Sequence, residues 1–483
     1  MQAPTEDIRS GDGAQGTPHR RLVVVGAGIS GLAAAWSAWE AGGSGPTEVL
    51  VLEADPEVGG KAKSLERDGY LVEAGPTGYL DNEPVLEKLV ERAGVEKLPA
   101  DQAAARRFLV RGGKAREIKT SPVGFLRSGI ISPLGLMRML REPWIKKRVS
   151  AEEETIWAFA ERRLGREVAA QMIAPMVLGV FAGDAKKLSL PAAFPRMAEL
   201  EAEYASLFRA MAKLARAKKL EGGPSGPSGA LTSFADGLQT LPRGLAQRAP
   251  FEVRCGARVE SVTKNGERWQ IRVGGEESII EADALVLAGE SYSTSALLGA
   301  FAPKVAAELD ALPTPGVAVV ALGYGAEALG KVPHGFGALI PRGEGLRILG
   351  CLWDTHLFAG RAPDGQLLVR CMLGGSTDLE AADLSDDELR RTAIEDMAKL
   401  FGLREAPTFS EVISWQRAIP QYEVGHLARV ERIDAALAEH NGQGPVLQLA
   451  GNHTRGIAFG KAAAEGWRAG EAAALALSSR SPN

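Results

Sequence analysis

Three glycines near the N-terminus have the spacing of a phosphate-binding turn. Gly26, Gly28 and Gly31 form a G-x-G-x-x-G pattern between an apolar run, typical of a buried strand, and a predicted helix. Such a turn brings backbone N–H groups and the positive end of a helix dipole close to a pyrophosphate. Glu53 ends the next predicted strand, where a carboxylate can accept hydrogen bonds from a ribose. The pattern predicts a dinucleotide site made of Gly26, Ala27, Gly28, Ile29, Ser30, Gly31 and Glu53.

The overall composition narrows the classes of function. The chain has 483 residues, a net charge of -4, 45% hydrophobic residues and 24% charged residues. These values are ordinary for an α/β protein of at least two domains, and they do not favour a nucleic-acid partner. Its three cysteines lie far apart and its six histidines do not pair at metal-ligand spacing, so we expect no disulfide and no metal. Because neither a secretion signal nor an apolar spanning run is visible, we expect a cytoplasmic protein.

The elements that hold the turn form a predicted α/β fold. A strand at 21–25, a helix at 32–41 and a strand at 48–53 make one βαβ unit. Near the other end of the chain, a strand at 446–450 precedes an Ala-rich helix at 461–478.

In the middle of the chain, the spacing of apolar residues changes twice. Residues 84–220 are predicted to be mostly helical, and 221–229 are almost purely turn-forming, so they indicate a loop or domain joint. Short β-like runs follow in 251–287 and 315–375, and one large antiparallel sheet is their simplest explanation.

The residues after Glu53 resemble the FAD branch, rather than the NAD branch, of the two-dinucleotide-fold flavoproteins. Within 54–61, the pair Gly59-Gly60 lets the chain pass close to a cofactor diphosphate, and Lys61 supplies charge. The run 73–80 looks like the loop that passes alongside the flavin in that group. This resemblance implies one non-covalent FAD per chain, and it adds to the cofactor site Ala54, Lys61, Gly75, Pro76, Thr77 and Gly78.

Further motifs are similar to those of one family, the protoporphyrinogen oxidases with the closely similar coproporphyrinogen oxidases of haem synthesis. The similarity covers nearly the whole chain after residue 20, and the order and spacing of the motifs also agree. The matching stretches are 180–184, 188–189, 194–195, 229–239, 335–337, 372–375, 415, 419–422 and 425–426.

The resemblance implies a Rossmann-like two-dinucleotide-fold flavoprotein with an antiparallel-sheet substrate domain and a helical insertion. The expected parts are a disordered tail at 1–20, an FAD-binding domain from 21–83, 230–295 and 440–483, a helical and membrane-contacting unit at 84–220, a loop at 221–229, and a substrate-binding domain at 296–439.

The same resemblance implies roles for individual residues. Val259 meets the adenine end of FAD, Trp415 lies near the flavin, and backbone amides of Ile457, Ala458 and Phe459 border the isoalloxazine. The residues implied to bind substrate are Arg107, Phe336, Leu339 and Met372. Arg107 binds a propionate, and the three apolar side chains sandwich the macrocycle. No catalytic side chain is expected, because the flavin performs the redox step.

Two stretches depart from the family pattern. In 456–461, Ala458 stands where glycine is usual, and the polar pair that normally follows is absent. In 288–292, Glu290 lies where the family has a turn of small residues and proline.

The activity that the resemblance implies is the six-electron oxidation of protoporphyrinogen IX to protoporphyrin IX, with dioxygen as acceptor and hydrogen peroxide as by-product. Coproporphyrinogen III is the alternative substrate, because the two differ only in whether two positions carry vinyls or propionates. More remote alternatives are an amine oxidase, a carotenoid desaturase-like enzyme, and a flavin-binding protein without turnover.

Residues 121–148 are apolar with interspersed arginines, and they end in a basic cluster. This composition predicts either peripheral contact with the inner face of the cell membrane or a buried pocket wall. A homodimer also stays open from the sequence.

Overall fold

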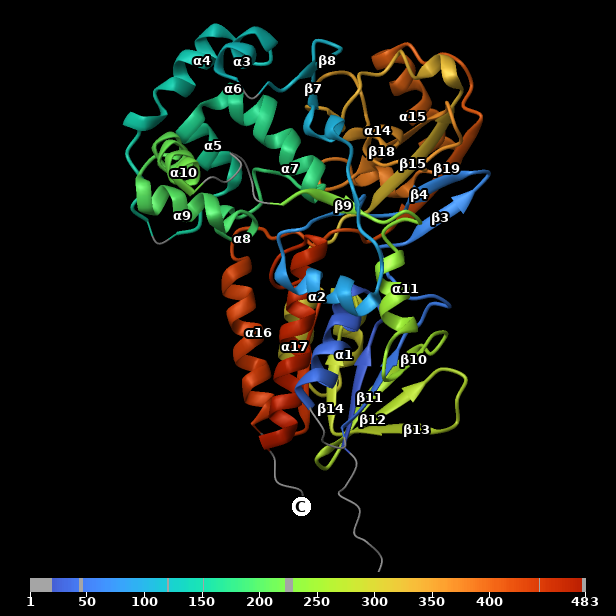
Figure 1. Ribbon diagram of the computed structural model, residues 1–483. Coiled ribbons are helices and arrows are strands. Elements are labelled where there is room, and N and C mark those ends of the chain that lie inside the picture. Colours follow the sequence, from blue (N-terminus) through green and yellow to red (C-terminus); the bar gives the residue numbers. More distant parts are fainter. Residues whose placement is uncertain are drawn as a thin grey trace, which may run out of the picture.

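The computed structural model describes residues 20–42, 47–119, 121–150, 152–221, 229–442 and 444–479. Of the predicted tail at 1–20, only Arg20 is among them, and it begins the first strand. Of the predicted loop at 221–229, only Glu221 and Gly229 are described, and Glu221 ends a helix. Figure 1 shows one half of the molecule with both ends of the described chain, and a second half in which a helical lobe lies beside a sheet.

A five-stranded parallel sheet forms the core of the first half. Its strand order is β10-β2-β1-β14-β20. The bounds are β1 Arg20–Val25, β2 Thr47–Leu52, β10 Glu252–Arg254, β14 Ala284–Leu287 and β20 Val446–Leu449. Helix α1, Ile29–Gly42, connects β1 to its parallel neighbour β2, so the predicted βαβ unit is confirmed. The central strands β1, β2 and β14 are apolar and buried over most of their length because helices and strands cover both faces of the sheet.

The last helix packs on the first. Helix α17, Phe459–Ser479, crosses α1 at two glycines. A Cβ on Gly466 would lie 2.0 Å from the Ser30 carbonyl oxygen, and one on Gly470 would lie 2.0 Å from that of Ala34. Only glycine permits this approach, so the predicted C-terminal helix is fixed against the start of the chain.

The other face of the parallel sheet is covered by a second layer. It contains a three-stranded antiparallel sheet and three helices. The bounds are β11 Val259–Asn265, β12 Arg268–Val273, β13 Ile279–Ala282, α12 Ser291–Leu298, α13 Pro303–Asp310 and α16 His426–Asn441. Residues 296–310 and 426–439 were expected in the substrate-binding domain. They share a hydrophobic core with the parallel sheet instead, through residues such as Val305 and Ile433.

A seven-stranded sheet dominates the second half, in the order β19-β15-β18-β17-β16-β7-β8. The bounds are β7 Arg107–Arg111, β8 Lys114–Glu117, β15 Val317–Tyr324, β16 Gly337–Leu339, β17 Gly350–Trp353, β18 Leu367–Gly374 and β19 Phe409–Trp415. Helix α15, Asp386–Phe401, covers one face. The expectation of one antiparallel sheet through 251–287 and 315–375 is therefore wrong: the two stretches lie in separate sheets, and β10 and β14 belong to the parallel one.

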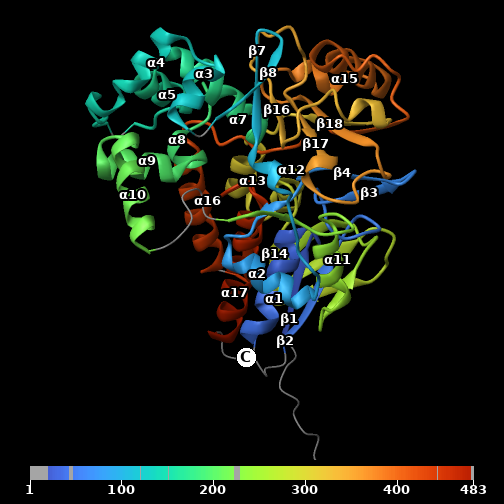
Figure 2. The same ribbon diagram turned by 45° about the horizontal axis from the view of Figure 1, so that its top comes forward.

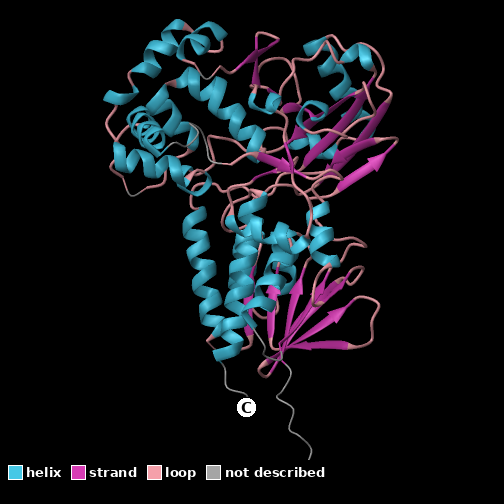
Figure 3. Cartoon of the chain, viewed as in Figure 1, coloured by secondary structure: helices cyan, strands magenta, loops and turns pink. Residues whose placement is uncertain are grey.

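The segment 84–220 is helical only in part. Helix α2, Pro84–Ala93, packs in the first half against α1 and α17, and β7 and β8 extend the seven-stranded sheet. The remaining helices form the lobe in the upper left of Figure 3. They are α3 Pro122–Ser128, α4 Pro133–Leu140, α5 Ile156–Leu164, α6 Arg166–Val168, α7 Ala174–Phe181, α8 Leu190–Ala193, α9 Pro195–Tyr204 and α10 Leu207–Glu221.

The lobe is held by a buried charge cluster. The Arg163 guanidinium is fully buried and lies 3.2 Å from Glu142 and 2.7 Å from Glu201.

Within the described residues, no helix is long and apolar enough to cross a membrane.

Short strands lie between the two halves, namely β3 Ser64–Arg67, β4 Tyr70–Glu73, β5 Tyr79–Leu80, β6 Leu98–Pro99 and β9 Leu231–Ser233. Helix α11, Thr240–Gln247, packs in the core of the first half, and α14, Asp354–Leu357, packs on β18. Strand β9 pairs with both β5 and β6, so the chain passes between the halves there.

Candidate active site

The glycine turn has the geometry that its sequence predicted. Gly26 has φ 105°, in the left-handed region, and a Cβ on Gly31 would lie 1.8 Å from the Gly26 carbonyl oxygen. A Cβ on Gly28, by contrast, would meet no atom within 4 Å. Gly26 and Gly31 are thus needed by the fold itself. The space at Gly28 is open at the N-terminus of α1, where first-turn amides lack helical partners and a diphosphate fits.

Glu53 is held ready beside this turn. Its carboxylate accepts hydrogen bonds from the N–H of Ala27 at 2.6 Å and of Asp55 at 2.9 Å, and the residue is buried. Each oxygen keeps a free lone pair, which is what ribose hydroxyls require. Ala54 follows directly and is half-buried.

Val259 begins the strand β11, close to Glu53 in the fold. The Ala257 N–H donates to the Glu53 carbonyl at 2.7 Å, and the Glu53 N–H donates to Arg254 at 2.9 Å. The chain from β10 to β11 therefore borders the end of β2, where the ribose and adenine end of the cofactor is expected.

The second glycine pair closes over the first turn. The Gly59 N–H donates to the Ala27 carbonyl at 2.9 Å, and Gly60 lies against Gly28. Lys61, expected to supply charge to the diphosphate, forms a 2.8 Å ion pair with Glu290 and donates to the Ala418 carbonyl. Its charge is therefore already balanced within the protein. This ion pair gives a physical reason for Glu290, the residue that departs from the family pattern.

The loop expected alongside the flavin is held from the seven-stranded sheet. The buried Arg370 guanidinium donates to the Glu73 carbonyl at 2.6 Å and to Thr77 Oγ1 at 2.6 Å. The Trp415 indole N–H donates to the Ala74 carbonyl at 2.7 Å. Trp415 thus lies beside the loop that contains Gly75, Pro76, Thr77 and Gly78, and its place near the flavin stays a prediction.

Two of these glycines have no room for a side chain. A Cβ on Gly75 would lie 2.2 Å from the Lys61 carbonyl oxygen, and one on Gly78 would lie 2.5 Å from that of Thr232. The loop is therefore pressed between the 59–61 turn and strand β9.

Buried charges around the loop were not visible in the sequence. Arg370 forms an ion pair with Asp354 at 2.6 Å, and both side chains are at most 4% exposed. Glu73 is also buried, and this burial raises the pKa of its carboxyl although Ser64 and two arginines oppose the shift. Its oxygens accept from Ser64 Oγ at 2.7 Å and from the Leu238 N–H at 2.8 Å.

The C-terminal loop connects β20 to α17. Ile457 packs against the hydrophobic cluster of the helical lobe, Ala458 is exposed, and Phe459 begins α17 with its ring 6.1 Å from that of Tyr79. Gly456 has φ 81°, so it supplies the left-handed residue of this turn.

His453, on the same loop, is 2% exposed, and within the described structure neither ring nitrogen has a hydrogen-bond partner. Burial, and then the neighbouring His426, lower the pKa of His453 to about 4, so its ring is neutral at pH 7.

The four predicted substrate residues form two pairs. The Arg107 guanidinium lies over the Phe336 ring, 5.3 Å from its centroid. Leu339 and Met372 flank Gly350 in one row across β16, β17 and β18. Residues paired in this way point to the same face, about 10 Å apart. Leu339 and Met372 therefore lie on one wall, and the sandwich of a macrocycle by Phe336, Leu339 and Met372 stays a prediction.

This wall is the sheet face opposite α15, and it also holds Arg370 and Trp415 in neighbouring rows. Helix α7 approaches it, since a Cβ on Gly179 would lie 2.4 Å from Leu339. Arg107, Leu339 and Met372 thus lie on the sheet face that also holds the loop at 73–78 through Arg370.

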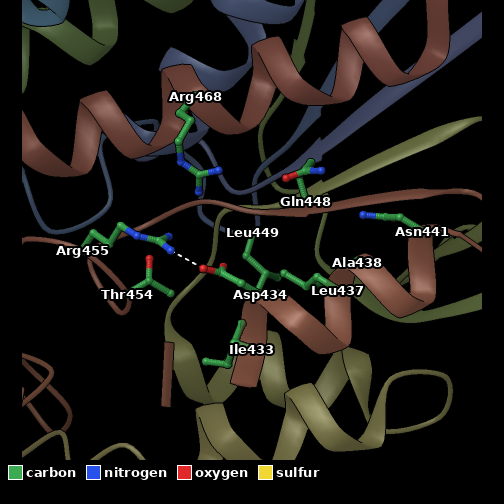
Figure 4. Close-up of a pocket in the computed structure, with 10 residues that line it drawn as sticks. All are labelled: Ile433, Asp434, Leu437, Ala438, Asn441, Gln448, Leu449, Thr454, Arg455 and Arg468. Atoms are coloured by element: carbon green, nitrogen blue, oxygen red, sulfur yellow. Dashed lines mark hydrogen bonds and ion pairs between the residues drawn. The ribbon is translucent and has the colours of Figure 1, made fainter. Parts of the chain in front are cut away.

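A small groove elsewhere contains none of the predicted residues. It lies between α16, β20 and α17 and has a volume of about 180 Å³ (Figure 4). Arg455 spans it to form an ion pair with Asp434. Ligand pockets usually measure about 300–1,000 Å³, so this groove is too small for a dinucleotide or a tetrapyrrole.

Replacing Gly28 by alanine tests the turn separately from the fold. Gly28→Ala meets no atom of the protein, so we expect an unchanged midpoint of unfolding for the FAD-free protein but weaker FAD binding by at least tenfold. Gly330→Ala, also at a glycine with no atom within 4 Å, is the matched control and should bind FAD normally. Titration of FAD fluorescence measures the affinity of both variants for FAD. Equal affinity in the two variants would contradict the placement of the diphosphate.

Replacing Arg370 by leucine tests the buried ion pair. The change leaves Asp354 buried without its partner, and we expect the free energy of unfolding to fall by about 3–5 kcal/mol. Arg268→Ala, which breaks a half-exposed pair with Glu281, should lower it by at most about 1 kcal/mol. Urea unfolding at pH 7 decides, and similar losses in both variants would show that burial of the first pair has little weight.

Comparison with known proteins agrees with this geometry. The family described as flavin containing amine oxidoreductase matches residues 29–474. Protoporphyrinogen oxidase 1 of spinach chloroplasts is 31% identical, over 91% of this chain and 81% of its own. Coproporphyrinogen III oxidase of Bacillus subtilis is 27% identical, over 87% of this chain and 91% of its own.

The fold also agrees with a solved structure. An Exiguobacterium protein provisionally named a protoporphyrinogen oxidase superposes with a TM-score of 0.82, over 95% of this chain and all of that one, at 23% identity. The cofactor is FAD, which the match to the flavin containing amine oxidoreductases supports. The chain belongs to the flavin-containing amine oxidoreductases, in the branch of the protoporphyrinogen oxidases and coproporphyrinogen III oxidases.

Proposed function

We propose that this protein oxidises a porphyrinogen to the corresponding porphyrin in haem biosynthesis, with protoporphyrinogen IX as substrate and dioxygen as final acceptor. FAD, when bound, would supply the redox chemistry for the three two-electron oxidations of the substrate. The names of the relatives support this activity. The structural observation that carries it is a cation, Arg107, at the border of an apolar sheet face that also holds the flavin loop.

The residues of the chain have a binding and orienting role in this proposal. The side chains of Leu339 and Met372 offer an apolar wall to the macrocycle, and Gly350 between them leaves the wall flat. Arg107 is exposed, and among the described residues it has no carboxylate partner. A guanidinium with free donors can bind a propionate in bidentate geometry, which would set the ring orientation relative to the flavin.

The choice of substrate depends on the number of propionates that the site can pair. Coproporphyrinogen III carries four and protoporphyrinogen IX carries two, so a second cation near the wall would favour the former. Arg370 shares the face, but Asp354 already neutralises it. This neutralised charge favours the substrate with fewer propionates.

Turnover of the two porphyrinogens tests the activity. The FAD-loaded protein should produce fluorescent porphyrin faster from protoporphyrinogen IX than from coproporphyrinogen III, relative to a control without enzyme. Preference for coproporphyrinogen III would reverse the substrate assignment, and no turnover of either would favour a flavin-binding protein without catalysis.

Arg107→Ala should raise KM for protoporphyrinogen IX about tenfold or more, because a charge-assisted hydrogen bond contributes about 1.5–3 kcal/mol. The neighbouring Arg106→Ala is the matched control. Arg106 is equally exposed but is paired with Glu117 at 3.0 Å, so its loss should leave KM within about twofold. Equal effects of the two changes would speak against a specific role for Arg107.

A second part of the proposal concerns location: a cytoplasmic protein that contacts the inner face of the cell membrane through α3, α4 and the residues that follow. Leu134 is 73% exposed and Trp144 is 77% exposed, and Leu126, Met137 and Leu140 are also exposed. The alternative of a buried pocket wall does not suit these side chains, since Ile130, Ile131 and Leu136 fill the interior instead.

Charge favours an anionic membrane at this surface. Residues 121–150 contain six Lys or Arg and a single acidic residue, Glu142, which is buried. Helices α3 and α4 lie at the periphery of the lobe, away from the parallel sheet (Figure 2). Exposed apolar side chains beside basic ones are typical of interfacial binding.

Vesicle sedimentation tests this surface. The protein should bind vesicles with 30% anionic lipid and not neutral ones, and Leu134→Glu with Trp144→Glu should abolish binding. Leu379→Glu, at a side chain that is 65% exposed outside the lobe, is the matched control and should bind as before. Binding that survives the double change would exclude α3 and α4 as the contact.

A further inference from the structure

The motif Ile419-Pro-Gln-Tyr422 with Gly425-His426 contains none of the residues to which the resemblance gave a role. In the structure it forms a strap, residues 421–426, between the helical lobe and the C-terminal loop. Gln421, Tyr422 and His426 are each at most 2% exposed. Residues 421–425 lie outside the helices and sheets, and His426 begins α16. Buried polar groups in such a segment must find specific partners, so their contacts indicate what the strap does.

On one side the strap contacts the helical lobe. The Ser189 N–H donates to the Tyr422 carbonyl at 2.8 Å, and the Val424 N–H donates to the Lys187 carbonyl at 3.0 Å. The Gln421 side-chain amide donates to the carbonyl of Phe181, the last residue of α7, at 2.9 Å. The backbone of the strap is therefore fixed to the lobe.

On the other side, two side chains of the strap reach the loop after β20. The Tyr422 hydroxyl donates to the Asn452 carbonyl, and His426 Nε2 lies 2.8 Å from the Thr454 carbonyl. A carbonyl only accepts, so Nε2 carries the proton. The two rings are stacked, with centroids 4.0 Å apart and planes 13° from parallel, so each limits the movement of the other.

The loop that these bonds hold is the one expected beside the flavin. Asn452 and Thr454 lie between β20, in the dinucleotide-binding sheet, and residues 456–459. The virtual Cβ of Gly451 lies 3.7 Å from the Gly289 carbonyl, and that of Gly26 lies 3.4 Å from the Gly289 N–H, so the loop starts next to the glycine turn. Tilting either carbonyl would rotate the peptide groups that lead to Ile457.

We propose that Tyr422 and His426 are flavin-positioning residues, which fix the carbonyls of Asn452 and Thr454 and thereby set the course of the 456–459 loop against FAD. They act through the backbone and need no contact with the substrate. The proposal rests on the FAD site alone and not on which porphyrinogen is oxidised.

The test uses the full-length protein and FAD itself. Tyr422→Phe removes one hydroxyl and keeps the stacked ring. His426→Ala removes the donor, and His426→Gln restores an N–H at a similar distance. Tyr324→Phe is the matched control, because the Tyr324 hydroxyl is also buried but, within the described structure, has no hydrogen-bond partner.

Three quantities are measured: the Kd for FAD, the visible absorption spectrum of the bound flavin, and its midpoint potential. Tyr422→Phe and His426→Ala should each weaken FAD binding about tenfold, the effect of one lost hydrogen bond in a buried site, and should shift the spectrum and the potential. His426→Gln should return all three toward the wild-type values, and Tyr324→Phe should not change them.

A merely structural role would give a different result. It would lower the midpoint of thermal unfolding while the Kd, spectrum and potential of the flavin stayed as in the wild type, and this outcome would overturn the proposal. If His426→Ala does not fold, the conservative Tyr422→Phe decides alone. Because no readout uses a porphyrinogen, a failure here is distinguishable from a failure of the proposed activity.

Discussion

The buried Arg370 guanidinium, which pairs with Asp354, is the group on which the contact between the seven-stranded sheet and the 73–78 loop depends. Arg370 belongs to the central strand region of the seven-stranded sheet, yet its other donors bind the chain at Glu73 and Thr77. Removing a guanidinium from water is costly, and the cost is offset only when all of its donors are satisfied. The side chain is therefore stable in one geometry, in which the loop at 73–78 lies against the seven-stranded sheet.

Other contacts at the junction follow the same rule. Trp415 donates to the carbonyl of Ala74, and Arg361 donates to the carbonyls of Phe234 and Ala235, which follow β9. Each bond joins a side chain of the second half to a backbone carbonyl of a connecting segment. Irregular backbone is thus held in place by polar groups from a regular sheet, which is a general way to position a cofactor on rigid elements.

The sequence predicted the parts of the site that are local. The glycine turn, Glu53 and the first βαβ unit lie within 34 residues and have a pattern that the physics of phosphate binding explains, so Gly26, Gly28 and Gly31 could be found without a structure. Arg370 and Glu73 are 297 positions apart, and Lys61 and Ala418 are 357 apart. No periodicity connects such residues, so these hydrogen bonds and the contacts of the strap could only be found in three dimensions.

The sequence contains a local signal for β7 and β8, which lie in the segment predicted to be mostly helical. Gly112-Gly113 between the two strands is a two-residue hairpin signature, and both glycines have positive φ. The division into separate sheets had no such signal, because a period of two is the same in one large sheet and in two smaller ones. Assignment of α13 and α16 to the wrong half has a similar cause: amphipathic helices show that a face is buried, but not against which sheet.

The loop from Gly451 to Phe459 shows how these constraints combine. Its first end is fixed by β20 in the parallel sheet, and its last end by α17, which Gly466 and Gly470 hold against α1. Between the ends, Ile457 packs on the helical lobe, and the Tyr422 and His426 side chains donate hydrogen bonds to two carbonyls of the loop. A loop fixed at both ends has few conformations left, so a small number of hydrogen bonds in its middle is sufficient to choose among them. The unusual Ala458 is tolerated for the same reason: it is exposed, and the course of the backbone is determined by its neighbours rather than by that residue.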